Sequence, residues 1–284
     1  MLAYEGLLTA MVTPFAPDGS VDEDGFVTVG HHLLAHGSDG LVVAGTTGEA
    51  ATMTDEEQIS LFALARDEFG DYVAGVGSND TRHAIHLTEQ AVAHGARALL
   101  SVTPYYNKPN RRGILGHFTA VAKAAAGVPV ILYNIPGRTA VNMGPDLLAE
   151  LAQIDGIDAV KQANSDEVQP IDGLAVLAGN DDILAKVLDM GGAGGICVSS
   201  HIVGPEMKCL LTEPHRRSQL DAQLRDVYEA MFLTASPAPV KAALAMLGLP
   251  SGTLRLPLVE CDDDETAQIR SVLQHHGVLE RATA

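Results

Sequence analysis

The 284-residue sequence predicts an α/β fold: a (β/α)8 TIM barrel with a small C-terminal helical extension. Eight short aliphatic runs alternate with longer amphipathic segments over roughly the first 200 residues. Each run is almost continuously apolar rather than alternating, as expected for parallel strands that are covered on both faces. Eight strands interleaved with helices, in a chain of this length, favour a closed barrel.

Strands and helices can be assigned in chain order. The strands are expected at Leu7–Val12, Gly40–Ala44, Tyr72–Gly77, Ala98–Val102, Val128–Asn134, Ile157–Lys161, Leu174–Ala178 and Gly195–Val198. Between them, amphipathic periodicity predicts helices that include Glu56–Phe69, Thr81–His94, Gly116–Ala126 and Asp146–Gln153. Thr52 and Thr54 are candidate caps for the first of these helices, which has acidic residues in its first turn.

Two observations weigh against competing interpretations. An open, doubly wound sheet usually has a glycine-rich turn after its first strand, and this chain has Thr13-Pro14-Phe15 there. The glycine-rich run 191–195 precedes the eighth strand, so we interpret it as a tight turn rather than a phosphate site. Helical patterns then continue, including Arg216–Thr234 and Pro239–Leu247. We therefore expect a catalytic barrel over residues 1–224 and a helical extension over residues 225–284.

The composition limits the partners and the compartment. A formal charge of −18, from 36 acidic and 18 basic side chains, disfavours nucleic acid and anionic membranes as partners. No apolar stretch reaches the ~18 residues that a membrane span needs. Three cysteines without a repeated spacing fit a reducing cytoplasm rather than a disulfide framework. The eleven histidines lack the spacing of a zinc site, and we expect no metal.

Lys161 is the strongest candidate for a nucleophile, because barrel active sites lie at the C-terminal ends of the strands. Of the six lysines, Lys161 alone ends an apolar strand, and Lys108 is expected in a wet loop. The other four are expected to be solvated or snorkelling side chains on helices, namely Lys123, Lys186, Lys208 and Lys241. Removal from water makes an amine a nucleophile near neutral pH. A structural lysine paired with a carboxylate is the alternative, and its position alone does not decide between the two.

Three further groups follow strand ends at the same face. Tyr133 could relay protons from the strand before Lys161, or it could be a packing residue. Thr46 and Thr47 lie in the glycine-flanked turn 45–49, which could hold a carboxylate, although such turns are common. Arg138 offers a bidentate fork suited to a substrate carboxylate, and a surface ion pair is the alternative.

Four motifs in this order resemble those of one known family. They are Gly45-Thr46-Thr47-Gly48-Glu49, the run from Thr103 to Pro109, the run from Tyr133 to Thr139, and Lys161. The similarity covers nearly the whole chain, from the segment 8–15 to Leu254-Arg255-Leu256-Pro257. The chain therefore resembles the dihydrodipicolinate synthases, a family in the superfamily that contains N-acetylneuraminate lyase.

The resemblance implies a lyase that condenses pyruvate through a lysine Schiff base. Lys161 would form the imine with pyruvate, with no metal or organic cofactor. Thr46, Tyr133 and Tyr106 would form a proton relay, with Tyr106 supplied across a tight dimer interface. A homo-oligomer built as a dimer of dimers is therefore the expected assembly.

The resemblance also implies how the substrates are bound. Thr47 would bind the carboxylate of pyruvate, and Arg138 would hold the carboxylate of the aldehyde, L-aspartate 4-semialdehyde. Gly179 and Ile196 would shape the pyruvate pocket. Another pyruvate-dependent aldolase, acting on a sugar acid or N-acetylneuraminate, is the nearest alternative. A non-catalytic, metabolite-binding barrel is the alternative from a different class.

Two departures from the family pattern carry expectations. Gln162 follows the lysine where many of these synthases carry an acidic residue. The family's site for feedback inhibition by lysine corresponds to Asp55, Gln58, Asn79, His83 and Tyr105. Asn79 and Tyr105 fit the lysine-sensitive pattern. Lysine-sensitive bacterial members, however, typically have an acidic residue at position 83 and histidines at positions 55 and 58. We therefore expect inhibition by lysine to be weak or absent.

Overall fold

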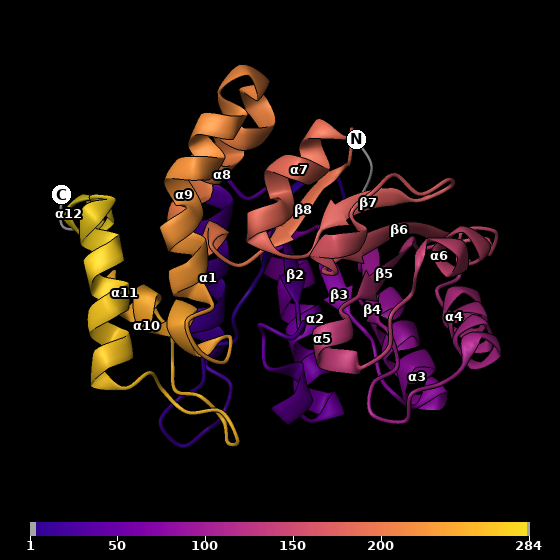
Figure 1. Cartoon of the computed structure of the whole chain (residues 1–284). Helices are drawn as coiled ribbons and strands as arrows, with labels where there is room; N and C mark the ends of the chain where they lie inside the picture. Colours follow the sequence, from indigo (N-terminus) through magenta and orange to yellow (C-terminus); the bar gives the residue numbers. More distant parts are fainter. Residues whose placement is uncertain (1–3, 283–284) are drawn as a thin grey trace.

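The computed structural model describes residues 4–282, in which eight parallel strands close into a barrel in sequence order (Figure 1). The strands are β1 Gly6–Ala10, β2 Gly40–Val43, β3 Val73–Gly75, β4 Ala98–Val102, β5 Val130–Asn134, β6 Ile157–Gln162, β7 Ala175–Ala178 and β8 Gly194–Cys197. β8 pairs with β1 and completes the ring. The predicted (β/α)8 barrel is confirmed.

Strand pairing fixes which side chains fill the barrel. Tyr133 on β5 lies opposite Lys161 on β6. Because side chains alternate across a strand, Lys161 shares its side with Ala159, and Tyr133 shares its side with Ile131. The inner cluster of buried residues contains Tyr133, Ala159 and Ile131, together with Tyr4, Leu8, Ala10, Val42, Val73, Ala98, Leu100, Leu177 and Ile196. Lys161 and Tyr133 therefore face the barrel interior at the C-terminal ends of their strands.

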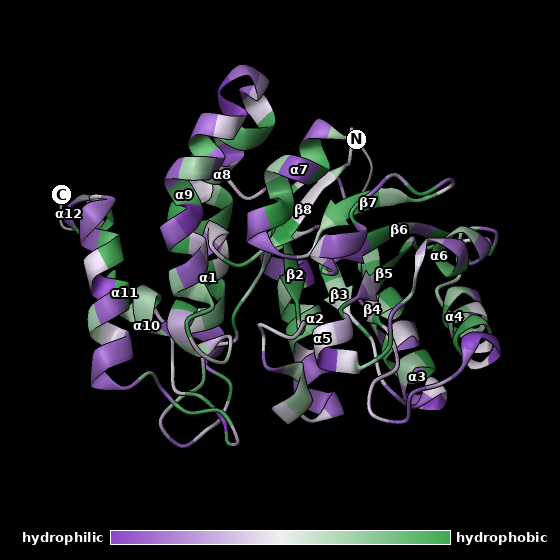
Figure 2. Cartoon of the chain, viewed as in Figure 1, coloured by the Kyte–Doolittle hydropathy of each residue, from purple (hydrophilic) through white to green (hydrophobic). Residues whose placement is uncertain are grey.

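Helices cover the outside of the barrel with their apolar faces turned inward (Figure 2). Those between β1 and β8 are α1 Glu23–Ala35, α2 Asp55–Phe69, α3 Thr81–Ala93, α4 Arg111–Ala124, α5 Pro136–Thr139, α6 Pro145–Leu151 and α7 Leu184–Asp189; α5 and α6 both follow β5, and the only helical element described between β6 and β7 is a 3₁₀ turn. The structure also has short 3₁₀ turns at Ala50–Thr52, Ser165–Glu167, Asp181–Ile183 and Pro214–Arg216. A second, larger core packs between these helices and the strands.

The observed elements match the expected strands to within two residues at either end. The helix expected from Gly116 begins earlier, at Arg111, because the Asn110 side chain accepts a hydrogen bond from Gly113 N and caps the helix there. Of the two candidate caps before α2, Thr54 forms the cap in a capping box with Glu57. The run 191–195 is a turn that leads into β8.

Within residues 4–282, five α-helices follow β8: α8 Ser200–Thr212, α9 Arg217–Met231, α10 Ala238–Met246, α11 Asp263–His275 and α12 Val278–Ala282. α11 and α12 lie beyond α9 and α10, at the side of the molecule away from the strands (Figure 1). The predicted boundary between residues 224 and 225 falls inside α9, and the division into two units stays a prediction. In the part of the chain described here, no helix is long and apolar enough to cross a membrane.

Two buried histidines make the stability of the fold sensitive to acid. His201, on α8, accepts a hydrogen bond from Val12 N at 3.2 Å through Nε2 and contacts Val198 O at 2.8 Å through Nδ1. Burial lowers the pKa of His201 to about 4 and that of His117 to about 4. Both pKa values lie below the ordinary value of 6.5 for the unfolded chain. Between pH 6.5 and 4 the unfolded state therefore binds more protons, and stability falls as the pH falls.

We predict that lowering the pH from 7 to 5 costs about 2 kcal/mol of unfolding free energy for each of these histidines. His201→Gln should remove about 2 kcal/mol of that pH dependence, whatever its cost at neutral pH. Urea unfolding of the variant at both pH values measures the difference, and His215→Gln, at an exposed position, is the control. Equal pH dependence in His201→Gln and the parent would contradict the prediction.

Candidate active site

Lys161 and Tyr133 lie together at the mouth of the barrel. The side chain of Lys161 is 5% exposed and that of Tyr133 is 6% exposed. Lys161 Nζ lies 4.2 Å from the centroid of the Tyr133 ring. Thr103 holds the end of β5, since its N–H and hydroxyl both donate to Tyr133 O, at 3.0 and 2.9 Å. A desolvated amine therefore lies beside a phenol on rigid neighbouring strands.

The turn after β2 carries Thr46 and Thr47. Thr46 is exposed and lines, with Tyr133, one cavity of about 260 Å³, whereas Thr47 is buried. Ala44 and Glu49 on either side of the threonines adopt φ values of 52° and 57°, a conformation that residues other than glycine rarely take. Backbone strain of this kind is held in place by its surroundings and is concentrated at functional sites.

Gly179 and Ile196 lie at the ends of the two strands after β6. The N–H of Gly179 donates to Gln162 O at 2.8 Å, and a Cβ at this position would lie 2.8 Å from the same oxygen. Glycine is therefore required by this close approach. Ile196 is fully buried in the inner cluster that also contains Tyr133.

Two predicted residues, Tyr106 and Arg138, are exposed rather than buried with this group. Tyr106 is 87% exposed and has a φ of 69° in the loop after β4. Arg138 is exposed on α5, directly after β5, and makes no ion pair with any residue that the structure describes. The structure of one chain thus brings Lys161, Tyr133 and Thr46 to one mouth, with Arg138 at its rim.

A neutral amide network that the sequence interpretation did not foresee supports the ends of β5 and β6. Asn134 Nδ2 donates to Gln162 Oε1 at 3.0 Å and to Asn142 Oδ1 at 2.9 Å. Gln162 Oε1 also accepts from Asn164 N at 2.9 Å. Gln162 is a neighbour of Lys161 on the strand and so points to the opposite side. At position 162, an amide side chain thus links the end of β5 to the segment that follows β6.

One of the lysine assignments is wrong. Lys241 is not solvated: its side chain is 3% exposed, and Nζ lies 2.6 Å from Glu49 Oε1, whose side chain is fully buried. α10 is apolar on nearly all sides and packs inside the extension, so its single lysine is buried with it. Lys123 and Lys186 are exposed, as expected, and Lys208 is half-buried beside Asp39.

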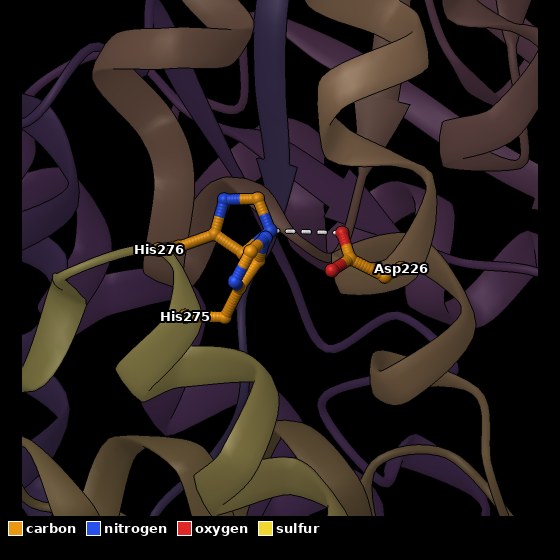
Figure 3. A group of neighbouring side chains, drawn as sticks. All are labelled: Asp226, His275 and His276. Carbon is orange, nitrogen blue, oxygen red and sulfur yellow. Dashed lines mark hydrogen bonds and ion pairs between the residues drawn. The ribbon is translucent and has the colours of Figure 1, made fainter.

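A cluster of Asp226, His275 and His276 joins α9 to the end of α11 (Figure 3). Its potential ligand atoms lie within 4.8 Å of one another, and two imidazoles with a carboxylate are a donor set that zinc uses. Asp226 Oδ1 already contacts His276 Nε2 at 2.8 Å, and His275 is exposed. We interpret the cluster as a helix-to-helix contact, and the absence of a metal from the reaction stays a prediction.

Fold and site together define a class. An inward-facing lysine that ends a barrel strand beside a tyrosine is the arrangement of a Schiff-base-forming lyase of the class I aldolase type. Comparison with known proteins agrees: the Dihydrodipicolinate synthetase family matches residues 3–276. The chain belongs to this family.

Curated relatives are similar over almost their whole length. The 4-hydroxy-tetrahydrodipicolinate synthase of Moorella thermoacetica is 43% identical over 96% of this chain and 98% of its own. That of Synechococcus elongatus is 41% identical over 96% of both chains. Among solved structures, DHDPS from Cyanidioschyzon merolae with lysine bound is 36% identical, with a TM-score of 0.93, and covers 98% of this chain and 100% of its own.

Proposed function

We propose that this enzyme condenses pyruvate with L-aspartate 4-semialdehyde to give 4-hydroxy-tetrahydrodipicolinate, a step in lysine and diaminopimelate biosynthesis. The observation that carries the proposal is the contact between the Lys161 amine and the Tyr133 ring, 4.2 Å apart, at paired strand ends of the barrel. The names of the full-length relatives support the choice of substrates.

The chemistry follows from the amine. Lys161 Nζ attacks the keto carbon of pyruvate, and loss of water gives a protonated imine. The protonated imine withdraws electrons, so the pyruvate methyl group loses a proton and the imine becomes an enamine. The enamine carbon then attacks the aldehyde carbon, and the product amine displaces Lys161 as the ring closes. The protonated imine on Lys161 thus accepts the electrons that an organic cofactor would otherwise accept, and the proposed reaction requires no such cofactor.

The neighbouring groups supply proton transfer. The Tyr133 ring lies beside the amine, with its centroid 4.2 Å from Nζ, and we assign to its hydroxyl the proton transfers during formation of the carbinolamine and loss of water. Thr46, which lines the same cavity, would connect Tyr133 with Tyr106 from a second subunit. The 87% exposure of Tyr106 fits a residue that serves a partner's site. We propose a homo-oligomer on this ground, and the resemblance to the family extends the proposal to a dimer of dimers that works in the cytoplasm.

Substrate binding is assigned to the rim and floor of the mouth. Thr47 would hold the carboxylate of pyruvate, with Gly179 and Ile196 enclosing it. Arg138 would take the carboxylate of the aldehyde, since its fork is exposed beside the strand that carries Tyr133.

Turnover of pyruvate with L-aspartate 4-semialdehyde, coupled to a reductase and NADPH oxidation, tests the proposal. We expect brisk turnover with this aldehyde and little cleavage of N-acetylneuraminate. Turnover only with N-acetylneuraminate or sugar acids would reassign the enzyme to the related aldolases. Loss of both turnover and pyruvate trapping would favour a non-catalytic barrel.

We predict that L-lysine inhibits this enzyme weakly or not at all. The Asp55 carboxylate, which could hold an ammonium group, already contacts His83 Nε2 at 2.8 Å and lies 3.8 Å from His86. Gln58 donates to Ala50 O at 3.2 Å. Initial rates at rising lysine concentration measure the effect, and strong inhibition by sub-millimolar lysine would contradict the prediction.

A further inference from the structure

The buried Lys241 joins the helical extension to the turn that carries Thr46 and Thr47. Lys241 Nζ lies 2.6 Å from Glu49 Oε1 and donates to Thr253 O at 2.8 Å. Burial lowers the pKa of Lys241, and Glu49 opposes that shift. A buried ammonium is tolerated only with such partners, so the pair ties α10 firmly to the mouth of the barrel.

Glu49 transmits this contact to the threonines. Its backbone N–H donates to Thr46 O at 3.0 Å and its carbonyl accepts from Thr52 N at 2.9 Å. The side-chain Oε2 accepts from Arg255 N at 3.1 Å. Glu49 also holds the strained φ of 57° that ends the turn. Lys241 and Arg255 of the extension thus hold the two carboxylate oxygens of Glu49. These contacts fix the backbone of the turn that carries Thr46.

Arg255, from the motif 254–257, completes the attachment. Its guanidinium donates to Glu57 through two nitrogens at 2.5 and 2.7 Å, to Thr52 O at 2.9 Å, and to Gly19 O at 2.6 and 2.9 Å. The Phe15 ring lies under both cations, 4.2 Å from Arg255 Cζ and 4.7 Å from Lys241 Nζ. Such an arrangement favours cation–π attraction. In Figure 1, the loop after β1 and the loop before α11 run side by side below α1 and α9, consistent with the bond from Thr253 N to Phe15 O.

We propose that Glu49, Lys241 and Arg255 are positioning residues that set the geometry of the Thr46–Thr47 turn, so that the C-terminal extension controls pyruvate binding and proton transfer. This inference rests on the proposed roles of Thr46 and Thr47. In this proposal, Glu49, Lys241 and Arg255 do not touch the substrate. A displacement of about 1 Å at a reacting group can lower the rate on the order of 100-fold. The contacts of Glu49 with Lys241 and Arg255 should therefore affect the rate of the reaction.

Glu49→Gln and Lys241→Met test the proposal. Each should raise KM for pyruvate and lower kcat, together reducing kcat/KM for pyruvate on the order of 10- to 100-fold, while KM for the aldehyde changes little. In the Lys241→Met background, Glu49→Gln should add far less than it does alone, because the two residues act as one unit. The rate at which borohydride traps pyruvate should fall in parallel, and this readout needs no aldehyde.

Arg217→Met is the matched control, since Arg217 is a buried arginine of α9 paired with Asp189 at 2.6 Å, away from the turn. It should lower the melting temperature but keep kcat and KM per folded enzyme. Arg255→Gln provides a second variant if Lys241→Met fails to fold. Wild-type kcat and KM in folded Glu49→Gln and Arg255→Gln would overturn the proposal. If the wild-type enzyme itself shows no turnover, the proposed function is overturned instead. The rate of pyruvate trapping, which needs no aldehyde, distinguishes this failure from failure of the positioning proposal.

Discussion

Lys161→Ala should lose turnover by several orders of magnitude, on the order of 10⁴ to 10⁶. The amine forms the only covalent link to substrate in the proposed reaction, and no neighbouring group can replace it. Tyr133 lies beside the amine but has no free nitrogen to form an imine. The coupled assay with pyruvate and L-aspartate 4-semialdehyde measures the loss.

The fold should survive this substitution, because Lys161 is a single inward side chain at the mouth of a barrel whose core lies below it. Circular dichroism and thermal melting check the fold. Lys123→Ala, at an exposed position on α4, is the matched control and should keep the parent's activity. Residual turnover within tenfold of the parent in Lys161→Ala would mean that the chemistry does not pass through this amine.

Arg138→Ala should separate the two substrates. Removing a bidentate, charge-assisted contact to the aldehyde carboxylate should reduce kcat/KM for L-aspartate 4-semialdehyde by about 10²- to 10³-fold. Trapping of pyruvate by borohydride should be unchanged, because the imine forms before the aldehyde binds. Arg138→Lys keeps the charge but not the fork, and should give an intermediate value.

Arg82→Ala is the control for this variant, since the Arg82 side chain is 93% exposed on α3. It tests whether loss of one positive charge from an acidic enzyme weakens anion binding in general. Equal losses in pyruvate trapping and in the aldehyde reaction of Arg138→Ala would refute the division of labour between Lys161 and Arg138.

The strands could be predicted closely because parallel barrel strands are buried on both faces and leave continuous apolar runs. The location of the active site at the mouth of the barrel could be predicted from the same apolar runs, because they place Lys161 and Tyr133 at the C-terminal ends of neighbouring strands. The position of Tyr106 as the exposed side chain of a loop was not predictable in the same way. Its proposed role depends on a second subunit, which periodicity in one chain does not describe.

The Lys241 assignment failed for a different reason. A lysine on a helix was assumed to reach water, but α10 is apolar around nearly its whole circumference and therefore buried. The sequence Ala238–Met246 contained that signal, although its partner, Glu49, is almost 200 residues away. The Asp226–His276 pair is long-range in the same way. Contacts of this kind depend on tertiary packing rather than on local pattern.

The most direct test of the central claim is to locate the trapped pyruvate. The enzyme is reduced with borohydride in the presence of pyruvate, digested, and its peptides are mapped by mass spectrometry. We expect a reduced pyruvyl adduct on Lys161 and none on the other five lysines, including the buried Lys241. An adduct on another lysine, or no adduct in an enzyme that turns over, would contradict the Schiff-base mechanism proposed for this barrel.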